Sequence, residues 1–141
     1  ARIGAWVGRI GERRALTIEY CGLIVVFTAY AFVSDAKWAA ALYILDHLFF
    51  SLAIAIKTYF QKIADPADMA STAGVAFTIN HIAAVVIPVI FGLIWLVSPS
   101  AVFLMGAAMV VISLILARNI PVSPHEGNEV LIGKVSLGSR Q

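Results

Sequence analysis

Four long apolar runs, separated by short polar connectors, constrain the fold of this chain more than any other feature. The runs cover residues 15–33, 38–60, 70–97 and 101–117, and they are between 17 and 28 residues long. A helix of about 20 residues crosses the hydrocarbon core of a bilayer. Because the runs lack the alternation of membrane β-strands, each is predicted to be a transmembrane helix. The predicted fold is all-α, a polytopic membrane bundle of four helices.

Composition excludes several other classes of protein. Hydrophobic residues make up 61% of the 141 residues and charged residues only 13%, with a net charge of +2. This small net charge gives no basic field for nucleic acid, so the expected partner is the lipid bilayer. The single cysteine, Cys21, cannot form an internal disulfide or a zinc site of paired cysteines. We expect no metal and no cofactor.

Basic residues fall almost entirely on one side of the predicted spans. The positive-inside rule then places both termini in the cytoplasm of a plasma or bacterial inner membrane, and an even number of spans agrees. The predicted organisation is a cytoplasmic loop over 1–14, a transmembrane domain over 15–117 and a mobile polar tail over 118–141. The basic residues on the cytoplasmic side are Arg2, Arg9, Arg13, Arg14, Lys62, Arg118, Lys134 and Arg140, against Lys37 alone outside.

The second run carries a polar and aromatic stripe. At about 100° per residue, Tyr43, Asp46, His47, Phe50 and Lys57 fall within one third of the helix circumference. Asp46 lies about 12 Å deep, where exposure of an aspartate to lipid costs ~3 kcal/mol. The stripe is therefore either a buried structural Asp-His pair or the wall of a cavity that handles substrate or protons. Because ionisable groups inside a membrane are usually functional, the cavity is the favoured interpretation. Lys57 is different, since it lies near the cytoplasmic end and its side chain can extend to the interface.

The third run repeats this pattern in the opposite direction. Phe77, Asn80 and His81 share one side, at a depth similar to that of Asp46. Asp46 and His81 are therefore expected to approach each other within about one helical turn. Pro88 predicts a kink, since proline removes a helical hydrogen bond. The residues on the opposite side, which suit lipid, are Val75, Ile82, Val86 and Val89.

The first and fourth runs are almost free of polar groups. Glu19 lies about one turn from the cytoplasmic interface, and we interpret it as an interfacial charge that reaches water or nearby arginines. The fourth run contains nothing ionisable. Its small residues, Gly106 and Ala107 among them, are typical of helix contacts in membranes.

The loop before the first run resembles the cytoplasmic loop motif of the major facilitator superfamily, G-x-x-x-D-R-x-G-R-R. Residues 4–14 read Gly-Ala-Trp-Val-Gly-Arg-Ile-Gly-Glu-Arg-Arg and lead directly into a span. Gly8 stands where the family has an acidic residue, and Glu12 stands where it has a basic one. The positions that match the motif are Gly4, Arg9, Gly11 and Arg13.

The resemblance implies a twelve-helix carrier of which this chain is the C-terminal third, helices nine to twelve. The missing N-terminal helices and a small-molecule substrate would be its partners, and the activity would be secondary active transport by alternating access. In such carriers the tenth and eleventh helices line the central cavity, the ninth and twelfth pack at the periphery, and the loop motif gates the cycle. An Asp beside a His suits proton coupling.

Two other classes remain open at this point. His47 and His81 could serve as axial ligands of a haem in a four-helix bundle, although Asp46 and Asn80 make their surroundings polar for a haem pocket. A structural four-helix membrane subunit would explain the spans but not the loop motif. No Ser/His/Asp set, metal cluster or phosphate loop can be assembled, so the chain is not expected to be an enzyme.

Overall fold

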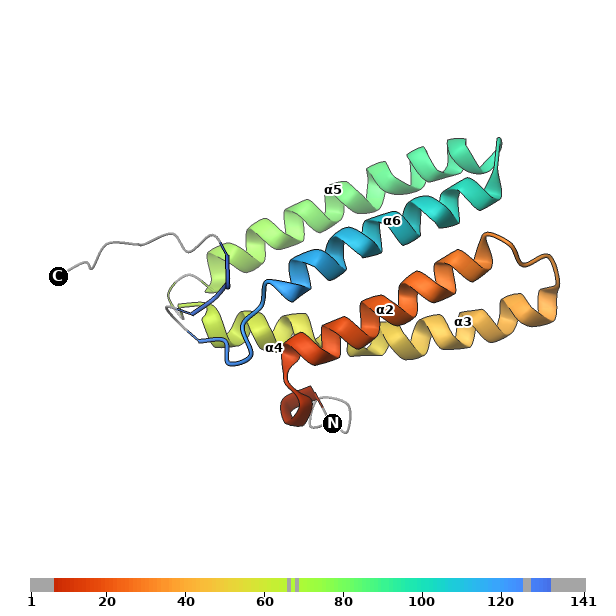
Figure 1. Cartoon of the computed structure of the whole chain (residues 1–141). Helices are drawn as coiled ribbons and strands as arrows, with labels where there is room; N and C mark the ends of the chain where they lie inside the picture. Colours follow the sequence, from red (N-terminus) through yellow and green to blue (C-terminus); the bar gives the residue numbers. More distant parts are fainter. Residues whose placement is uncertain (1–6, 66, 68, 126–127, 133–141) are drawn as a thin grey trace.

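The described part of the chain is helical, which confirms the predicted all-α class (Figure 1). The computed structural model describes residues 7–65, 67, 69–125 and 128–132. Within these ranges the only strand-like pairing is an isolated bridge between His125 and Asn128. The helices are α2 (Glu12–Tyr30), α3 (Ala36–Phe50), the 3₁₀ turn η1 (Ser51–Ala53), α4 (Ile54–Ile63), α5 (Met69–Trp95) and α6 (Pro99–Arg118).

Three helical segments in the described ranges are long and apolar enough to cross a membrane. They are Ala36–Ile63, Met69–Trp95 and Pro99–Arg118. Helix α2, which replaces the expected first span over 15–33, does not join them. It begins at Glu12 and ends at Tyr30, and its nineteen residues include two arginines and two glutamates. The chain is therefore a membrane-embedded helical protein with three clear spans and one charged helix beside them.

Helices α2 and α6 form the centre of the bundle. Helices α3 and α4 flank α2, and α5 flanks α6 on the other side (Figure 1). Among the described helices, no Cα of α3 or α4 lies within 8 Å of a Cα of α5. The order across this chain is thus α3 and α4, then α2, then α6, then α5.

The central position of α2 follows from a stripe of buried residues at three- and four-residue spacing, which places them on one helix face. Helix α6 meets this helix with small side chains, since Ala107 and Ala117 are buried and Gly106 lies against Phe27. Small residues let two helices approach closely, which is how helices associate in lipid. The buried residues of α2 are Glu12, Ala15, Leu16, Glu19, Leu23 and Val26.

An aromatic cluster joins the helices at the end that carries the α5–α6 connector. The rings of Tyr30 and Phe103 stack with centroids 4.9 Å apart, and Trp95 meets Phe103 edge-on at 5.8 Å. Tyr30 Oη donates to the carbonyl of Ala39 at 3.2 Å. This cluster connects α2 with α3, α5 and α6, and aromatic rings of this kind are enriched at membrane interfaces.

The second span is not one continuous α-helix, as the apolar run over 38–60 suggested. It changes to a 3₁₀ turn at Ser51–Ala53, where Ser51 Oγ donates to the Leu48 carbonyl at 2.6 Å. Helix α5, in contrast, continues through Pro88 from its first residue to its last. The break in helix geometry therefore lies a few residues beyond His47, in a stretch that has neither proline nor glycine.

The described residues that follow α6, where the sequence predicts a mobile tail, make hydrogen bonds to the helices. Asn119 Nδ2 donates to the carbonyl of Ile132 at 3.0 Å, and the Ile132 amide donates back to Asn119 Oδ1 at 2.7 Å. Tyr59 Oη on α4 donates to the carbonyl of Glu129 at 2.6 Å. The segment therefore folds back and connects the end of α6 to α4. Its buried residues are Ile120, Pro121 and Pro124.

Candidate functional site: two polar faces on the flanking helices

The first polar face centres on His47 in α3. Its Nδ1 lies 3.0 Å from the carbonyl oxygen of Tyr43, and the two rings contact each other with centroids 4.2 Å apart and planes tilted by 44°. Because a carbonyl oxygen can only accept, this hydrogen bond requires the proton on Nδ1. Nε2 is then left as a proton acceptor, on a side chain that is 58% exposed. Phe50, one turn further along, is also exposed.

Asp46 points in a different direction from its neighbour. It shares a helix face with Leu42 and Phe49, and Phe49 packs directly against Gly22 of α2. The carboxylate is only 26% exposed, and its Oδ2 lies 3.7 Å from His47 Nδ1, which already donates to Tyr43. The predicted stripe is thus divided, with Asp46 turned toward α2 and the aromatic and imidazole rings exposed.

The second polar face, on α5, has the same local geometry. His81 Nδ1 lies 3.1 Å from the Phe77 carbonyl, and their rings contact each other with centroids 4.0 Å apart and planes tilted by 38°. Asn80 precedes this histidine as Asp46 precedes His47. The chain therefore repeats one device, an aromatic residue four positions before a histidine that follows an Asx residue, and each copy leaves Nε2 free of its own helix.

The structure does not bring the two polar faces together. Helices α2 and α6 lie between α3 and α5, so the expected approach of Asp46 and His81 does not occur within this chain. The same separation leaves His47 and His81 unable to share one haem here. The two faces instead lie on opposite sides of the central pair α2 and α6.

Burial alone does not distinguish the two sides of α5. No residue of this helix is buried, and Phe77 on the polar side is 63% exposed while Ile82 on the apolar side is 60% exposed. The chemistry of the side chains distinguishes them, since one side carries an amide and an imidazole. The expectation that the Val75 side meets lipid stays a prediction.

Glu19 is a buried carboxylate that the sequence interpretation misplaced. It was expected to reach water or arginines, but its side chain is 3% exposed and Oε2 has no hydrogen-bond partner among the described atoms. It lies on the inner stripe of α2, two turns beyond Glu12. The three- and four-residue spacing of that stripe is the signal that would have found it.

The loop motif residues lie at the opposite end from the aromatic cluster. Gly4 lies outside the described residues. Gly11 has a positive φ of 84°, which a residue with a side chain rarely adopts. Arg9 is exposed and Arg13 half-buried.

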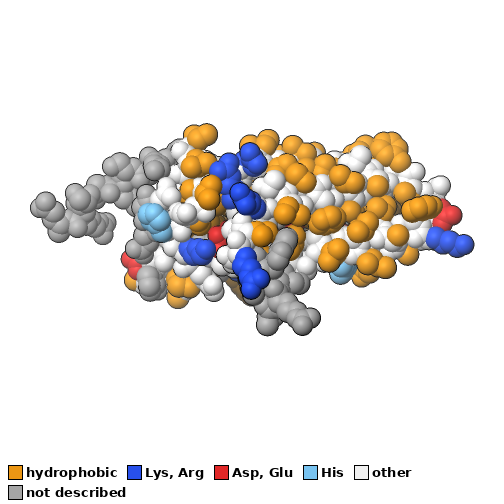
Figure 2. All heavy atoms as spheres, turned by 60° about the horizontal axis from the view of Figure 1, so that its bottom comes forward, with side chains coloured by type: hydrophobic (Ala, Val, Ile, Leu, Met, Phe, Trp, Pro, Cys, Tyr) orange, Lys and Arg blue, Asp and Glu red, His pale blue; other side chains and the backbone are white. Residues whose placement is uncertain are grey.

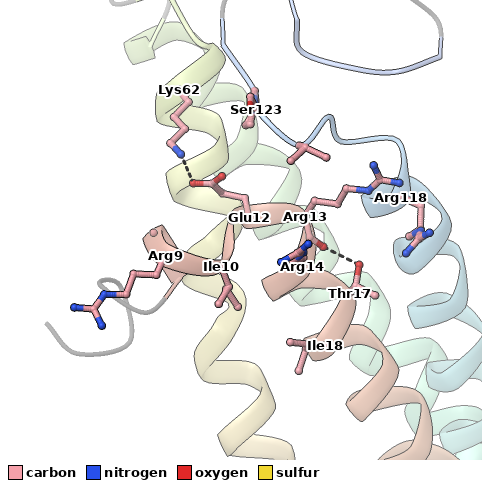
Figure 3. A pocket seen from close by; sticks show the side chains of 14 residues that line it. Arg9, Ile10, Glu12, Arg13, Arg14, Thr17, Ile18, Lys62, Arg118 and Ser123 are labelled. Atoms are coloured by element: carbon pink, nitrogen blue, oxygen red, sulfur yellow. Dashed lines mark hydrogen bonds and ion pairs between the residues drawn. The ribbon is translucent and has the colours of Figure 1, made fainter.

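Glu12, which departs from the family motif, makes the ion pair of this loop. Its Oε1 lies 2.7 Å from Lys62 Nζ at the end of α4, and the two charged groups form an ion pair (Figure 3). The carboxylate is 1% exposed. The loop is thus joined to the second span through a partner that is distant in sequence.

Comparison with protein-family models, with curated proteins and with solved structures gives no match to this chain. Among the residues that the structure describes, no three His, Cys, Asp or Glu side chains gather as a metal site. The functional argument therefore rests on the two polar faces and on the helices that present them.

Proposed function

We propose that the chain is part of a membrane carrier that moves a small molecule by alternating access. The polar faces of α3 and α5 form walls of its substrate or proton cavity. The observation that carries this proposal is the repeated aromatic-His device, which presents an unoccupied imidazole Nε2 from each of two membrane-spanning helices.

The depth of these polar groups in the spans supports a cavity rather than a lipid contact. Asp46 and His47 lie near the middle of a 28-residue span, and Asn80 and His81 lie well inside a 27-residue span. An ionised aspartate at the centre of a bilayer costs about 3 kcal/mol when it faces lipid. Polar groups at such depth therefore face protein or a water-filled cavity, and further helices of the same carrier would close that cavity around them.

We further propose that α2 is the fourth span and that both termini of the chain are cytoplasmic. Helix α2 lies alongside α6, whose composition suits a span, and so occupies the same depth (Figure 1). Its charges are compatible with that depth, because Glu12 is paired with Lys62 and Glu19 is turned inward. The basic residues gather at one end of the bundle, which favours that end as the cytoplasmic one.

The loop resemblance to the major facilitator superfamily supports the same class of protein. On this proposal the turn at Gly11, where φ is positive, and the arginines around it lie on the cytoplasmic side of a span, as the family motif does. On this proposal Arg9 and Arg13 belong to a gate that controls the conformational cycle, and α2 to α6 correspond to helices nine to twelve.

Cysteine accessibility tests the cavity without knowledge of the substrate. In the complete protein with Cys21→Ala, we expect Phe77→Cys and Tyr43→Cys to react with a charged, membrane-impermeant thiol reagent. The matched controls Ile82→Cys and Leu48→Cys lie at similar depth on other sides of the same helices and should not react. Equal labelling of Phe77→Cys and Ile82→Cys would contradict the cavity.

Labelling of the connectors tests the orientation in the same background. We expect Ala36→Cys, at the first residue of α3, to react with an impermeant reagent added outside intact cells. Ser123→Cys should react only after the membrane is opened. The reverse pattern would overturn the cytoplasmic placement of the C-terminal end. Labelling of both from outside would mean that the three helical segments between them do not all cross the membrane.

A further inference from the structure

A basin lined by basic side chains lies at the end of the bundle that carries the loop. Its volume is about 810 Å³, within the range of small-ligand sites. Three segments distant in sequence meet in it: the turn before α2 with the first turns of that helix, the end of α4, and the end of α6 with the residues that follow. Figure 2 shows Lys and Arg side chains gathered on this part of an otherwise apolar face.

The charges in this basin are unbalanced. Five cationic side chains line it against a single carboxylate, Glu12. That carboxylate is buried and already paired with Lys62. The four arginines make no ion pair within the described residues, so four positive charges remain uncompensated. They belong to Arg9, Arg13, Arg14 and Arg118.

Three of these arginines face the same space. Figure 3 shows Arg13, Arg14 and Arg118 gathered on one side of the basin, while Lys62 turns to Glu12 and Arg9 extends away. Arg13 comes from α2, where Thr17 Oγ1 donates to the Arg13 backbone carbonyl at 2.7 Å. The guanidinium groups therefore converge from two helices that the central packing keeps side by side.

We propose that this basin binds a phosphate-bearing anion. Like charges held together at the end of an apolar bundle repel each other unless an anion sits between them. A phosphate offers several oxygens, and arginine binds them through paired N–H groups in a fixed fork. This inference does not depend on the transport proposal, because it rests on charge and geometry at another place in the molecule.

Two sources can supply this chemistry, a phospholipid headgroup and a soluble phosphate. The basin lies at the end of membrane-spanning helices, where anionic headgroups meet basic side chains. The test therefore has two arms. The complete protein is placed in phosphatidylcholine nanodiscs and titrated with inorganic phosphate at constant ionic strength, and a second series contains increasing phosphatidylglycerol.

The thermal unfolding midpoint reports binding in both arms, since a ligand that binds only the folded state raises it. We expect the midpoint to rise in at least one arm. Arg14→Gln/Arg118→Gln, which changes two exposed side chains, should require roughly tenfold or more ligand for the same rise. Arg118→Gln alone should give an intermediate result. Lys37→Gln, an exposed cation at the opposite end, is the matched control and should behave as wild type.

The two titrations identify the anion that binds in the basin. A rise with phosphatidylglycerol alone assigns the site to a lipid headgroup, and a rise with inorganic phosphate in phosphatidylcholine assigns it to a soluble anion. No rise in either arm would overturn the proposal. An equal response of the double variant and wild type, or an equal loss in Lys37→Gln, would also overturn it, because the binding would then not be at this basin.

Discussion

The central pair, α2 and α6, and the flanking helices, α3 and α5, invert the usual relation between polarity and burial. Helix α2 carries four charged residues and buries six side chains, two of them glutamates. Helix α5 has no charged residue and buries none of its 27 residues. Lipid tails are as apolar as the side chains themselves, so burial of apolar side chains between helices gains no hydrophobic free energy in a bilayer. Helices therefore associate there through small residues and polar contacts. Burial in this chain follows fit between helices, not hydropathy.

The largest expected effect lies on a flanking helix. Asp46→Asn keeps the shape and hydrogen bonding of the side chain but cannot take up a proton. If the α3 face serves a proton-coupled cycle, labelling of Phe77→Cys from outside should change with pH in the parent protein. In the Asp46→Asn variant, that change should fall by more than about tenfold, with protein abundance retained.

A structural Asp46 would behave differently in the same assay. Asn would then preserve the pH response, whereas Asp46→Leu would reduce abundance by leaving its polar surroundings unsatisfied. A wild-type pH response of Asp46→Asn would therefore return this aspartate to a packing role. Helix α3 would then have, like the central pair, a packing role and no role in proton coupling.

The next effect tests the seam between the central pair and α3. A side chain at Gly22 would overlap the ring of Phe49, so Gly22→Val should lower the free energy of unfolding by about 1–3 kcal/mol. Gly92→Val on α5 is the matched control, because a Cβ there meets nothing within 4 Å. Unfolding in detergent measures both variants. A second change, Phe49→Ala, should restore part of the loss, and equal effects at the two glycines would contradict the packed seam.

The two buried glutamates of α2 should respond oppositely to the same substitution. Glu19→Leu removes a buried carboxylate whose Oε2 has no partner, and we expect it to raise the free energy of unfolding by about 1–2 kcal/mol. Glu12→Leu deprives Lys62 of its partner and should lower it by about 1 kcal/mol, since this lysine is 44% exposed and can turn to water. Thermal unfolding at fixed lipid composition compares them. A loss of stability in Glu19→Leu would indicate a partner outside the described residues.

Sequence patterns predicted the elements of this fold better than their arrangement. Length and apolarity located α5 and α6 within a few residues, and Ser98 and Pro99 open α6 as their chemistry predicts. The placement of α2 between α3 and α6 was not predicted, because the length and apolarity of a run do not show which neighbours it packs against. Only the spacing of its buried stripe, read together with the small residues of α6, carries that information.

The candidate site was predicted in its residues but not in its geometry. The helical period placed Asp46 and His47 on one stripe, yet the fit of Phe49 against Gly22 turns the aspartate toward α2. The 3₁₀ turn at Ser51–Ala53 was not predicted because no proline or glycine marks it, and Pro88, which marks α5, does not end that helix. Such features depend on neighbours that a single sequence does not identify.

The smallest expected effect concerns the segment that connects the central pair to the α4 flank. Asn119→Ala removes both side-chain hydrogen bonds to Ile132 but leaves the bond from the Leu131 amide to the Asn119 carbonyl at 2.8 Å. Each lost bond is worth about 1 kcal/mol locally, so amide exchange at Ile132 should accelerate several-fold while the unfolding midpoint stays the same. Asn128→Ala, which loses one bond to the Ser123 carbonyl, is the control and should leave Ile132 unaffected. Unchanged exchange at Ile132 in Asn119→Ala would mean that Tyr59, through the Glu129 carbonyl, holds this segment against α4 without help from α6.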